Sequence, residues 1–341
     1  MSKEPLLLPV ITGAVVAFGA LGLWFTATKT KVTQQGYPGV ALQQVVNANT
    51  AAKVAKANVV PEAQPKADPG GKKASEVYQN VKVLGHLTEN EFLRLMTAIT
   101  EWVSPEEGCT YCHNPENLAA DTLYTKVVSR RMLQMTQTIN DKWKPHVGQT
   151  GVTCYTCHRG KPVPAEIWFT EPEHRQAGRM VGDPQGQNAA GVRTVAYSSL
   201  PKDPLSPFLV KDTNIRVNAT TALPEKGPNP GIKQTEWTFA LMMHMSNSLG
   251  VNCTYCHNTR AVHDWGQSPP ARTTAWHGIR MVRELNNAYL DPLKPTYPAE
   301  RLGPTGDAPK ANCTTCHQGV NKPLAGAAML KDYPELLAPK R

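Results

Sequence analysis

Residues 151–160 read GVTCYTCHRG, in which two cysteines are separated by two residues and a histidine follows the second. Three kinds of site use this spacing: a redox dithiol, half of a zinc site, and the covalent attachment point of a haem. The pattern occurs four times and accounts for all eight cysteines of the chain, starting at Cys109, Cys154, Cys253 and Cys313. No cysteine is therefore left over for a disulfide or a lipid anchor.

The repetition favours haem over the other two sites. Zinc knuckles need no histidine after the second cysteine, and a thioredoxin-like dithiol occurs once, beside a βαβ unit. Two thiols at this spacing can add to the vinyl groups of one porphyrin, with the adjacent histidine beneath the iron. We expect four covalently attached haem c groups, with thioethers from Cys109, Cys112, Cys154, Cys157, Cys253, Cys256, Cys313 and Cys316 and proximal ligands His113, His158, His257 and His317.

The composition suits a chain that folds around rigid cofactors. It has 341 residues, is 40% hydrophobic and only 7% aromatic, and contains 29 prolines and 25 glycines. This balance predicts a mainly α protein with long irregular segments. The motif starts fall into two pairs, which suggests a pseudo-two-fold domain over residues 76–341 with haem pairs in 76–200 and 201–341.

The N-terminal region is predicted to be a membrane anchor followed by a linker. The stretch from Pro5 to Thr28 has no charged residue, and about 20 apolar residues span a bilayer as a helix. A cleaved signal peptide has a shorter apolar core, of about 7–15 residues, so we expect a retained transmembrane helix within residues 1–30. Residues 31–75 follow as an extended linker or strap, whose Ala/Pro/Lys-rich part (47–75) is expected to be a tether or a strap lying on another surface.

Each haem iron needs a sixth ligand, and the search for it indicates an internal repeat. Before the first motif, Thr88 and Glu91 are spaced as a capping box, and they open a helix that carries Met96. Before the third motif, a similar helix carries Met242 and has Gly250 as its expected C-terminal cap. A methionine in the same place of a haem-binding repeat is a candidate axial ligand.

The second and fourth motifs have comparable upstream segments. These segments read SRRMLQM and GIRMVREL and align at Met132 and Met281. The chain is thus predicted to contain four copies of helix, turn and Cys-x-x-Cys-His, with the methionine of each helix facing the haem attached after it.

Several longer stretches resemble the tetrahaem cytochrome subunit of purple bacterial photosynthetic reaction centres. Within residues 74–341 they include SEVYQNVKVLGHLTENEFLRLMTAITEWVSPEEGCTYCH, QTGVTCYTCHRG, TFALMMHMSNSLG, GIRMVRELN and CTTCHQGVNKPLAGA. The resemblance implies three Met/His haems, with Met96, Met132 and Met242 as ligands. It implies one bis-histidine haem, in which His146 joins His317. This differs from the repeat, which points to Met281; that residue is then expected to pack in the core.

The resemblance also implies a function and partners. Such a subunit relays electrons from a soluble cytochrome c or high-potential iron-sulfur protein to the photo-oxidised bacteriochlorophyll pair. It is an electron-transfer protein within a light-driven oxidoreductase complex. The implied partners are the reaction-centre L, M and H subunits with bacteriochlorophyll, a nearby light-harvesting complex and the membrane, with no nucleic acid. The haem domain would be periplasmic, on a single-pass anchor in the bacterial inner photosynthetic membrane. Many family members instead carry a lipid on an N-terminal cysteine, which this chain lacks.

Two other classes of multihaem protein share some of these sequence features. A membrane-anchored respiratory cytochrome of the quinol dehydrogenase type would use mainly histidine ligands, and only His146 offers itself clearly here. A multihaem reductase would need an iron with an open position or a Cys-x-x-Cys-Lys motif, and no such motif occurs. Neither fits as well as the reaction-centre subunit.

Charge around the first motif predicts where the electron donor docks. The chain has a formal net charge of +9, yet residues 87–109 contain one base, Arg94, against the acids Glu89, Glu91, Glu101, Glu106 and Glu107. Such a run can be an ordinary solvated face, but it would also steer a cationic soluble cytochrome. Arg272 is a candidate for tuning a haem potential, or an ordinary surface arginine. His277, four residues before Met281 on the same helical face, could contact the fourth haem or a propionate, but is expected to be a packing or hydrogen-bonding residue.

Overall fold

The computed structural model describes residues 29–35, 42–172, 200–218 and 230–339, together with positions 16, 195 and 198. Within these ranges the chain is mainly helical and has one two-stranded sheet, as expected for the fold class. The predicted membrane span, residues 5–28, lies outside the described residues except for position 16. No helix of the described ranges has the length and apolar character needed to cross a bilayer.

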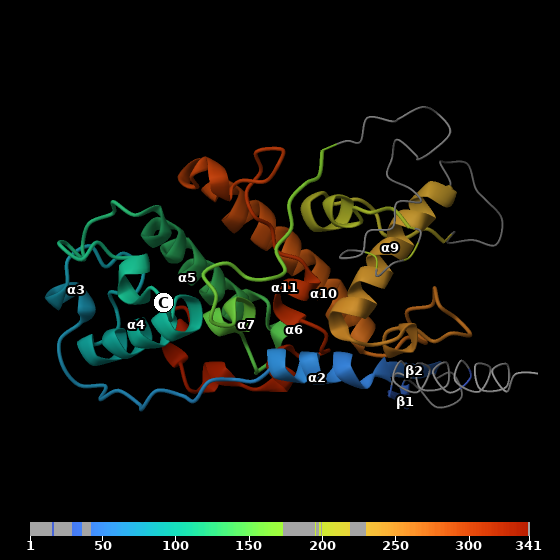
Figure 1. Cartoon of the computed structure of the whole chain (residues 1–341), viewed down its shortest axis with the longest axis horizontal. Helices are drawn as coiled ribbons and strands as arrows, with labels where there is room; N and C mark the ends of the chain where they lie inside the picture. The colour runs from blue at the N-terminus through green and yellow to red at the C-terminus, as the bar shows by residue number, and fades with distance from the viewer. Residues whose placement is uncertain are drawn as a thin grey trace, which may run out of the picture.

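Helices lie upstream of every Cys-x-x-Cys-His motif (Figure 1). The α-helices of the described ranges are α2 Ala48–Ala57, α3 Ala74–Val77, α4 Glu89–Val103, α5 Tyr124–Lys142, α6 Lys144–Val147, α7 Cys154–His158, α9 Ile232–Leu249, α10 Ala271–Glu284 and α11 Cys313–His317. Short 3₁₀ and π elements are η1 Gly108–Tyr111, η2 Ser206–Val210, η3 Cys253–Tyr255, η4 Leu285–Leu290, η5 Asp291–Thr296, η6 Ala299–Arg301, η7 Pro323–Gly326, η8 Met329–Lys331 and η9 Pro334–Leu336.

Two helix ends confirm the sequence predictions. The Thr88 hydroxyl accepts from the Glu91 amide and the Glu91 carboxylate accepts from the Thr88 amide, so the predicted capping box opens α4. Gly250 ends α9 in the left-handed region, at φ 63°, a conformation that glycine adopts without a steric penalty. Both caps satisfy backbone groups that a helix end leaves unpaired.

The N-terminal linker is more ordered than the sequence suggested. Strands β1 Thr30–Gln35 and β2 Leu42–Asn47 form an antiparallel hairpin, and α2 follows directly. The Asn47 side chain caps α2 by accepting from the amides of Asn49 and Thr50. The expectation of an irregular strap is therefore wrong for residues 48–57, because an alanine-rich stretch behind a good N-cap is a strong helix former.

Beyond α2, the strap contacts the packed domain of this chain itself. Arg94 of α4 donates from its guanidinium to the carbonyl oxygens of Gln64 and Pro65, at 2.9 and 2.7 Å. The Gln64 amide donates to the Tyr333 hydroxyl at 2.8 Å. The segment is extended because its backbone groups find partners on the packed domain instead of in a helix or sheet.

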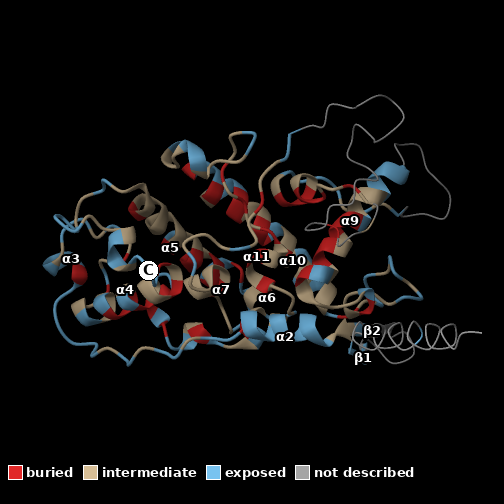
Figure 2. Ribbon diagram, in the orientation of Figure 1, coloured by how far each residue is buried: buried red, intermediate tan, exposed pale blue. Residues whose placement is uncertain are grey.

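Two apolar clusters hold the haem-motif region together (Figure 2). One joins Leu95 and Trp102 of α4 to Tyr333 and Leu336 near the C-terminus. The other gathers α9, α10 and the segments around them, and includes Leu241, Met281 and Leu285. Helix α5 belongs to both, since Leu133 lies in the first cluster and Ile139 in the second. This shared helix ties the two ends of the described domain together.

Candidate haem sites

A large cavity runs through three of the four motifs. Its volume is about 1210 Å³, larger than the roughly 300–1,000 Å³ of a pocket for one drug-sized ligand, so it has room for more than one such group. The motif and ligand residues that line it are Met96, Cys109, Cys112, His113, Met132, His146, Cys154, Cys157, His158, Cys313, Cys316 and His317. The third motif contributes only Tyr255 to this lining.

The second and fourth motifs form the same local structure. Each is a five-residue helix, α7 and α11, with a capping box at its start. The residue after each histidine is left-handed, with φ 52° at Arg159 and 46° at Gln318. The first and third motifs instead begin as 3₁₀ turns, η1 and η3. Local structure thus pairs the first motif with the third and the second with the fourth.

The motif histidines are oriented by backbone carbonyl groups. Nδ1 of His158 and of His317 lies 2.9 and 3.0 Å from the carbonyl oxygen three residues later. Nδ1 of His113 and of His257 lies 2.9 Å from the carbonyl oxygen five residues later. A carbonyl can only accept, so Nδ1 carries the hydrogen and the Nε2 lone pair is left to bind a metal.

His146 of α6 follows the same rule. Its Nδ1 lies 3.0 Å from the carbonyl oxygen of Thr274 on α10, and its ring centroid lies 6.0 Å from that of His317, with the ring planes at 70°. An iron bonded to one nitrogen of each ring needs a separation of about this size, because metal–imidazole bonds are about 2 Å long. The buried His244 differs, because its Nε2, the nitrogen that would bind a metal, lies 3.4 Å from the Ser248 hydroxyl.

Burial keeps these imidazoles in the neutral, iron-binding form. Burial lowers the pKa of His317 to about 4, and burial also lowers the pKa of His146, His158 and His257. Neutral imidazole is the species that coordinates iron, so the histidines do not have to lose a proton to bind it at neutral pH.

The surroundings of Cys154 and Cys313 differ from those of a reactive dithiol or a zinc site. Burial raises the pKa of Cys154 and Cys313 to about 12, whereas reactive dithiols have lowered values. Across the described residues, no three side chains of His, Cys, Asp or Glu converge closely enough to hold a metal ion, although structural zinc uses four such ligands. Haem attachment remains the use that the surroundings of these cysteines fit.

The predicted methionine ligands lie on the helices upstream of their motifs. Met96 on α4 and Met132 on α5 line the cavity, and Met242 on α9 packs beside the second apolar cluster. Met281 on α10 is 6% exposed and belongs to that cluster, as a core residue would. The assignment of each sixth ligand stays a prediction.

The second and fourth motifs touch, which the sequence did not predict. The Sγ atoms of Cys157 and Cys316 form a disulfide, with their Cα atoms 4.6 Å apart, although the sequence left no cysteine for one. Thioether bonds would use the same two sulfurs, so the disulfide and haem attachment are alternative uses of these thiols. The Arg159 guanidinium also donates to the Cys316 carbonyl oxygen at 3.0 Å. Haems attached to these two motifs would therefore be neighbours.

Contacts between motifs define a linear order. The Gly160 amide, after the second motif, donates to the Trp102 carbonyl oxygen on α4 at 2.8 Å. At the other end, Asn321 after the fourth motif donates to the Tyr255 hydroxyl of the third motif at 2.8 Å. Since the second and fourth motifs also touch, the spatial order is first, second, fourth, third, along the long axis of the molecule (Figure 1).

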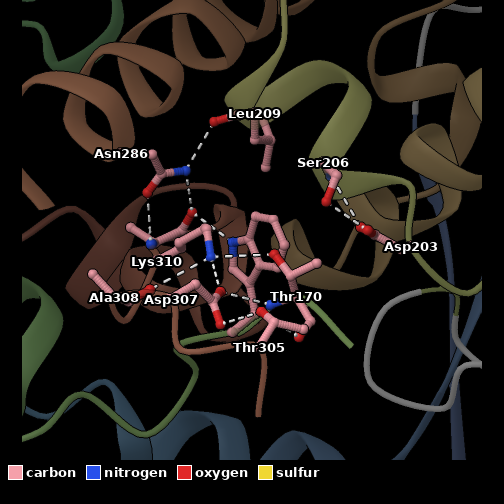
Figure 3. Close-up of polar contacts among 11 residues, drawn as sticks. Thr170, Asp203, Ser206, Leu209, Asn286, Thr305, Asp307, Ala308 and Lys310 are labelled. Carbon is pink, nitrogen blue, oxygen red and sulfur yellow. Dashed lines mark hydrogen bonds and ion pairs between the residues drawn. The ribbon is translucent and has the colours of Figure 1, made fainter. Parts of the chain in front are cut away.

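The segment before the fourth motif is fixed by a polar network (Figure 3). Asn286 of η4 donates to the carbonyl oxygens of Leu209 and Ala311, at 2.9 and 3.0 Å, and accepts from the Ala311 amide at 2.8 Å. Lys310, which is 8% exposed, pairs with Asp307. Since unpaired buried polar groups are costly, this network strongly favours one position for the chain that enters α11.

The surroundings of the first motif combine a buried cation with surface acids. Lys126 on α5 is 7% exposed and donates to the Leu118 carbonyl oxygen at 2.6 Å, the same atom that His113 contacts. Glu106 and Glu107 are exposed. Arg94, the one base of the acidic run, is instead buried and paired with Glu335 at 2.9 Å, so the surface here is more acidic than the sequence alone suggested.

The two other predicted positions have ordinary packing partners. Arg272 is half-buried; it donates to the Asp264 carbonyl oxygen at 3.0 Å and the Ser268 hydroxyl at 2.7 Å. His277 makes an edge contact with Trp276, at 4.8 Å between ring centroids. Sequence reasoning missed Lys126, Thr274 and Gly278, of which only Gly278 carried a signal, as a glycine inside a helical pattern.

Comparison with known proteins agrees with the earlier resemblance. Residues 26–337 match the family described as "Photosynthetic reaction centre cytochrome C subunit". The subunit of this name from Rubrivivax gelatinosus (strain NBRC 100245 / IL144) is 56% identical over 303 residues, which cover 89% of this chain and 82% of the relative. That from Thermochromatium tepidum is 55% identical over 304 residues, covering 89% and 74%. The chain therefore belongs to the family of photosynthetic reaction centre cytochrome c subunits, and its function is electron transfer.

Proposed function

We propose that this chain binds four haem c groups and relays electrons from a soluble periplasmic carrier to the photo-oxidised bacteriochlorophyll pair. The carrier would be a small cytochrome c or a high-potential iron-sulfur protein. The observation that carries the proposal is the shared orientation of five histidines, each with Nδ1 at a backbone carbonyl oxygen. The haem groups supply one-electron redox chemistry, and the chain supplies attachment, axial ligands and environment.

The residues that would hold each iron follow from the motifs and their neighbours. The proposed axial pairs are Met96 with His113, Met132 with His158, Met242 with His257, and His146 with His317. Two protein ligands at each iron would exclude substrate and water from it, which suits electron transfer and not catalysis at the metal. The eight motif cysteines would fix each group in place. The similar turns of alternate motifs support a pseudo-two-fold arrangement of four repeats.

The spatial order of the motifs supports a route and an orientation. The β1–β2 hairpin lies at the third-motif end, where Gln44 donates to the Gly250 carbonyl oxygen at 2.6 Å. Since the hairpin directly follows the predicted anchor, this end would face the membrane and the L, M and H subunits, near the light-harvesting complex. The first motif lies at the far end, where a soluble donor has access. Electrons would pass from the first to the second, fourth and third motifs.

Purification from photosynthetic membranes tests the proposal. The protein should copurify with bacteriochlorophyll, contain four haems per chain by pyridine haemochrome assay, and be oxidised within one flash of light. A preparation with fewer haems, or one that is reduced by quinol in the dark and ignores light, would contradict it. The second outcome would favour the respiratory cytochrome.

Donor docking is tested at the acidic end. Replacing Glu106 and Glu107 together by Gln should slow bimolecular reduction by a cationic cytochrome and flatten its salt dependence, because steering is screened beyond about 8 Å at physiological salt. Glu236→Gln on α9, at the other end of the motif series, is the matched control and should leave the rate unchanged. A rate that is independent of salt and of the double substitution would instead indicate an apolar docking surface, of the kind expected for an iron-sulfur donor.

A further inference from the structure

Helix α10 lacks a side chain where the ring of His146 lies against it. A Cβ atom added to Gly278 would lie 2.6 Å from Cε1 and 2.9 Å from Nδ1 of His146, closer than packed atoms approach each other. Gly278 is buried. The Thr274 carbonyl oxygen, one helical turn earlier, holds the same Nδ1 at 3.0 Å. The imidazole is therefore seated directly on the helix backbone.

The backbone conformation does not explain this glycine. Gly278 lies inside α10 and is not among the positive-φ residues of the described chain, so any L-residue could adopt its backbone angles. A glycine inside a helix normally lowers stability relative to alanine. Space for the imidazole is the remaining reason for glycine at this position.

Gly278 lies on α10, the helix from which the sequence repeat predicts Met281 as the ligand of the fourth haem. Met281, one turn after Gly278, is buried in the apolar cluster. The ring of His146 instead reaches the fourth motif and comes within 6.0 Å of the ring of His317. The glycine at 278 makes room for His146, and Met281 packs in the core instead of serving as the ligand that the repeat predicts.

We propose that Gly278 is a positioning residue for the fourth haem. Its missing side chain and the Thr274 carbonyl oxygen form a seat that holds the ring of His146 beside that of His317, where the two histidines would hold the fourth haem. The inference rests on the proposed His146/His317 ligation. It predicts that the smallest possible addition, one methyl group at Gly278, alters the ligand field of one haem only.

The experiment compares Gly278→Ala, His146→Gly and the double variant in the intact membrane-bound protein. Gly278→Ala should change the electron paramagnetic resonance signal of the bis-histidine haem and shift its potential, leaving the other three haems unchanged. Thr273→Ala, at an exposed position of α10, is the matched control and should be silent. Added imidazole should restore the signal of His146→Gly. It should bind the double variant about tenfold more weakly, because an overpacked contact typically lowers affinity by about this factor or more.

The outcomes separate the seat from the ligation. If His146→Gly removes the bis-histidine signal but Gly278→Ala changes nothing, the seat is wrong and the ligation stands. If His146→Gly leaves the signal intact, the proposed ligation itself fails. If Gly278→Ala does not accumulate, the double variant should restore accumulation, since the steric conflict has been removed. Failure to restore it would overturn the seat.

Discussion

The second and fourth motifs share one attachment structure but differ in the helices before them. Both motifs are short helices with a capping box, a left-handed residue after the histidine, and a carbonyl three residues on that orients Nδ1. Upstream, α5 runs for 19 residues and carries Met132 into the cavity. Helix α10 runs for 14 residues, places Met281 in the core and then continues as a π turn.

If the proposed ligands are right, this contrast means that the attachment turn and the sixth ligand are determined separately. The turn is encoded locally, within about ten residues. The sixth ligand depends on which side chain the packed helices deliver to the other face of the haem. In the proposed ligation, His146 and the seat at Gly278 would be enough to replace the methionine that the repeat predicts.

The largest effect is expected from replacing the methionine at the aligned position of each helix, Met132 or Met281, by leucine. Met132→Leu should remove the sixth ligand of the second haem, which becomes high-spin and binds carbon monoxide when reduced. Met281→Leu should leave all four haems low-spin, because the two side chains are similar in volume and Met281 packs in the core. Met135→Leu on α5 is a second control. Carbon monoxide difference spectra provide the measurement, and carbon monoxide binding by Met281→Leu would show that the repeat was the better guide.

A smaller effect is expected from exchanging the kind of ligand. His146→Met should raise the potential of one haem by on the order of 100 mV, because thioether ligation favours the reduced iron. Redox titration followed at the haem absorbance bands measures it. The other three potentials should stay in place. A shift of a different haem, or of none, would reject His146 as a ligand.

The smallest effect extends the comparison to the first motif, which has a buried cation beside its histidine. Lys126→Met should lower the potential of the first haem by tens of millivolts, on the order expected for a nearby charge in a medium of intermediate dielectric. The substitution also removes the hydrogen bond from Lys126 to the Leu118 carbonyl oxygen, which His113 contacts as well. Lys82→Met is the matched control, since Lys82 and Lys126 both pair with Asp121 but the Lys82 side chain is 60% exposed. Equal shifts of the first haem's potential in both variants would mean that the burial of Lys126 and its bond beside His113 have no effect on that potential.

Sequence reasoning succeeded where structure is local. The capping box at Thr88 and the cap at Gly250 follow from residues only a few positions apart. The chain's own packing was missed: the strap lies across α4, and Arg94 is buried against Glu335, although 241 residues separate them. The contact between the second and fourth motifs was missed for the same reason. A local sequence pattern does not specify which distant segments come into contact, because those contacts depend on the packing of the whole domain.

The ligand sets of the oxidised, purified protein test the central claim most directly. Near-infrared absorption together with electron paramagnetic resonance distinguishes methionine–histidine from bis-histidine ligation. We predict three haems of the first kind and one of the second, with the bis-histidine signal lost in His146→Gly and retained in Met281→Leu. Four methionine–histidine haems, or a bis-histidine signal that survives His146→Gly, would contradict the account.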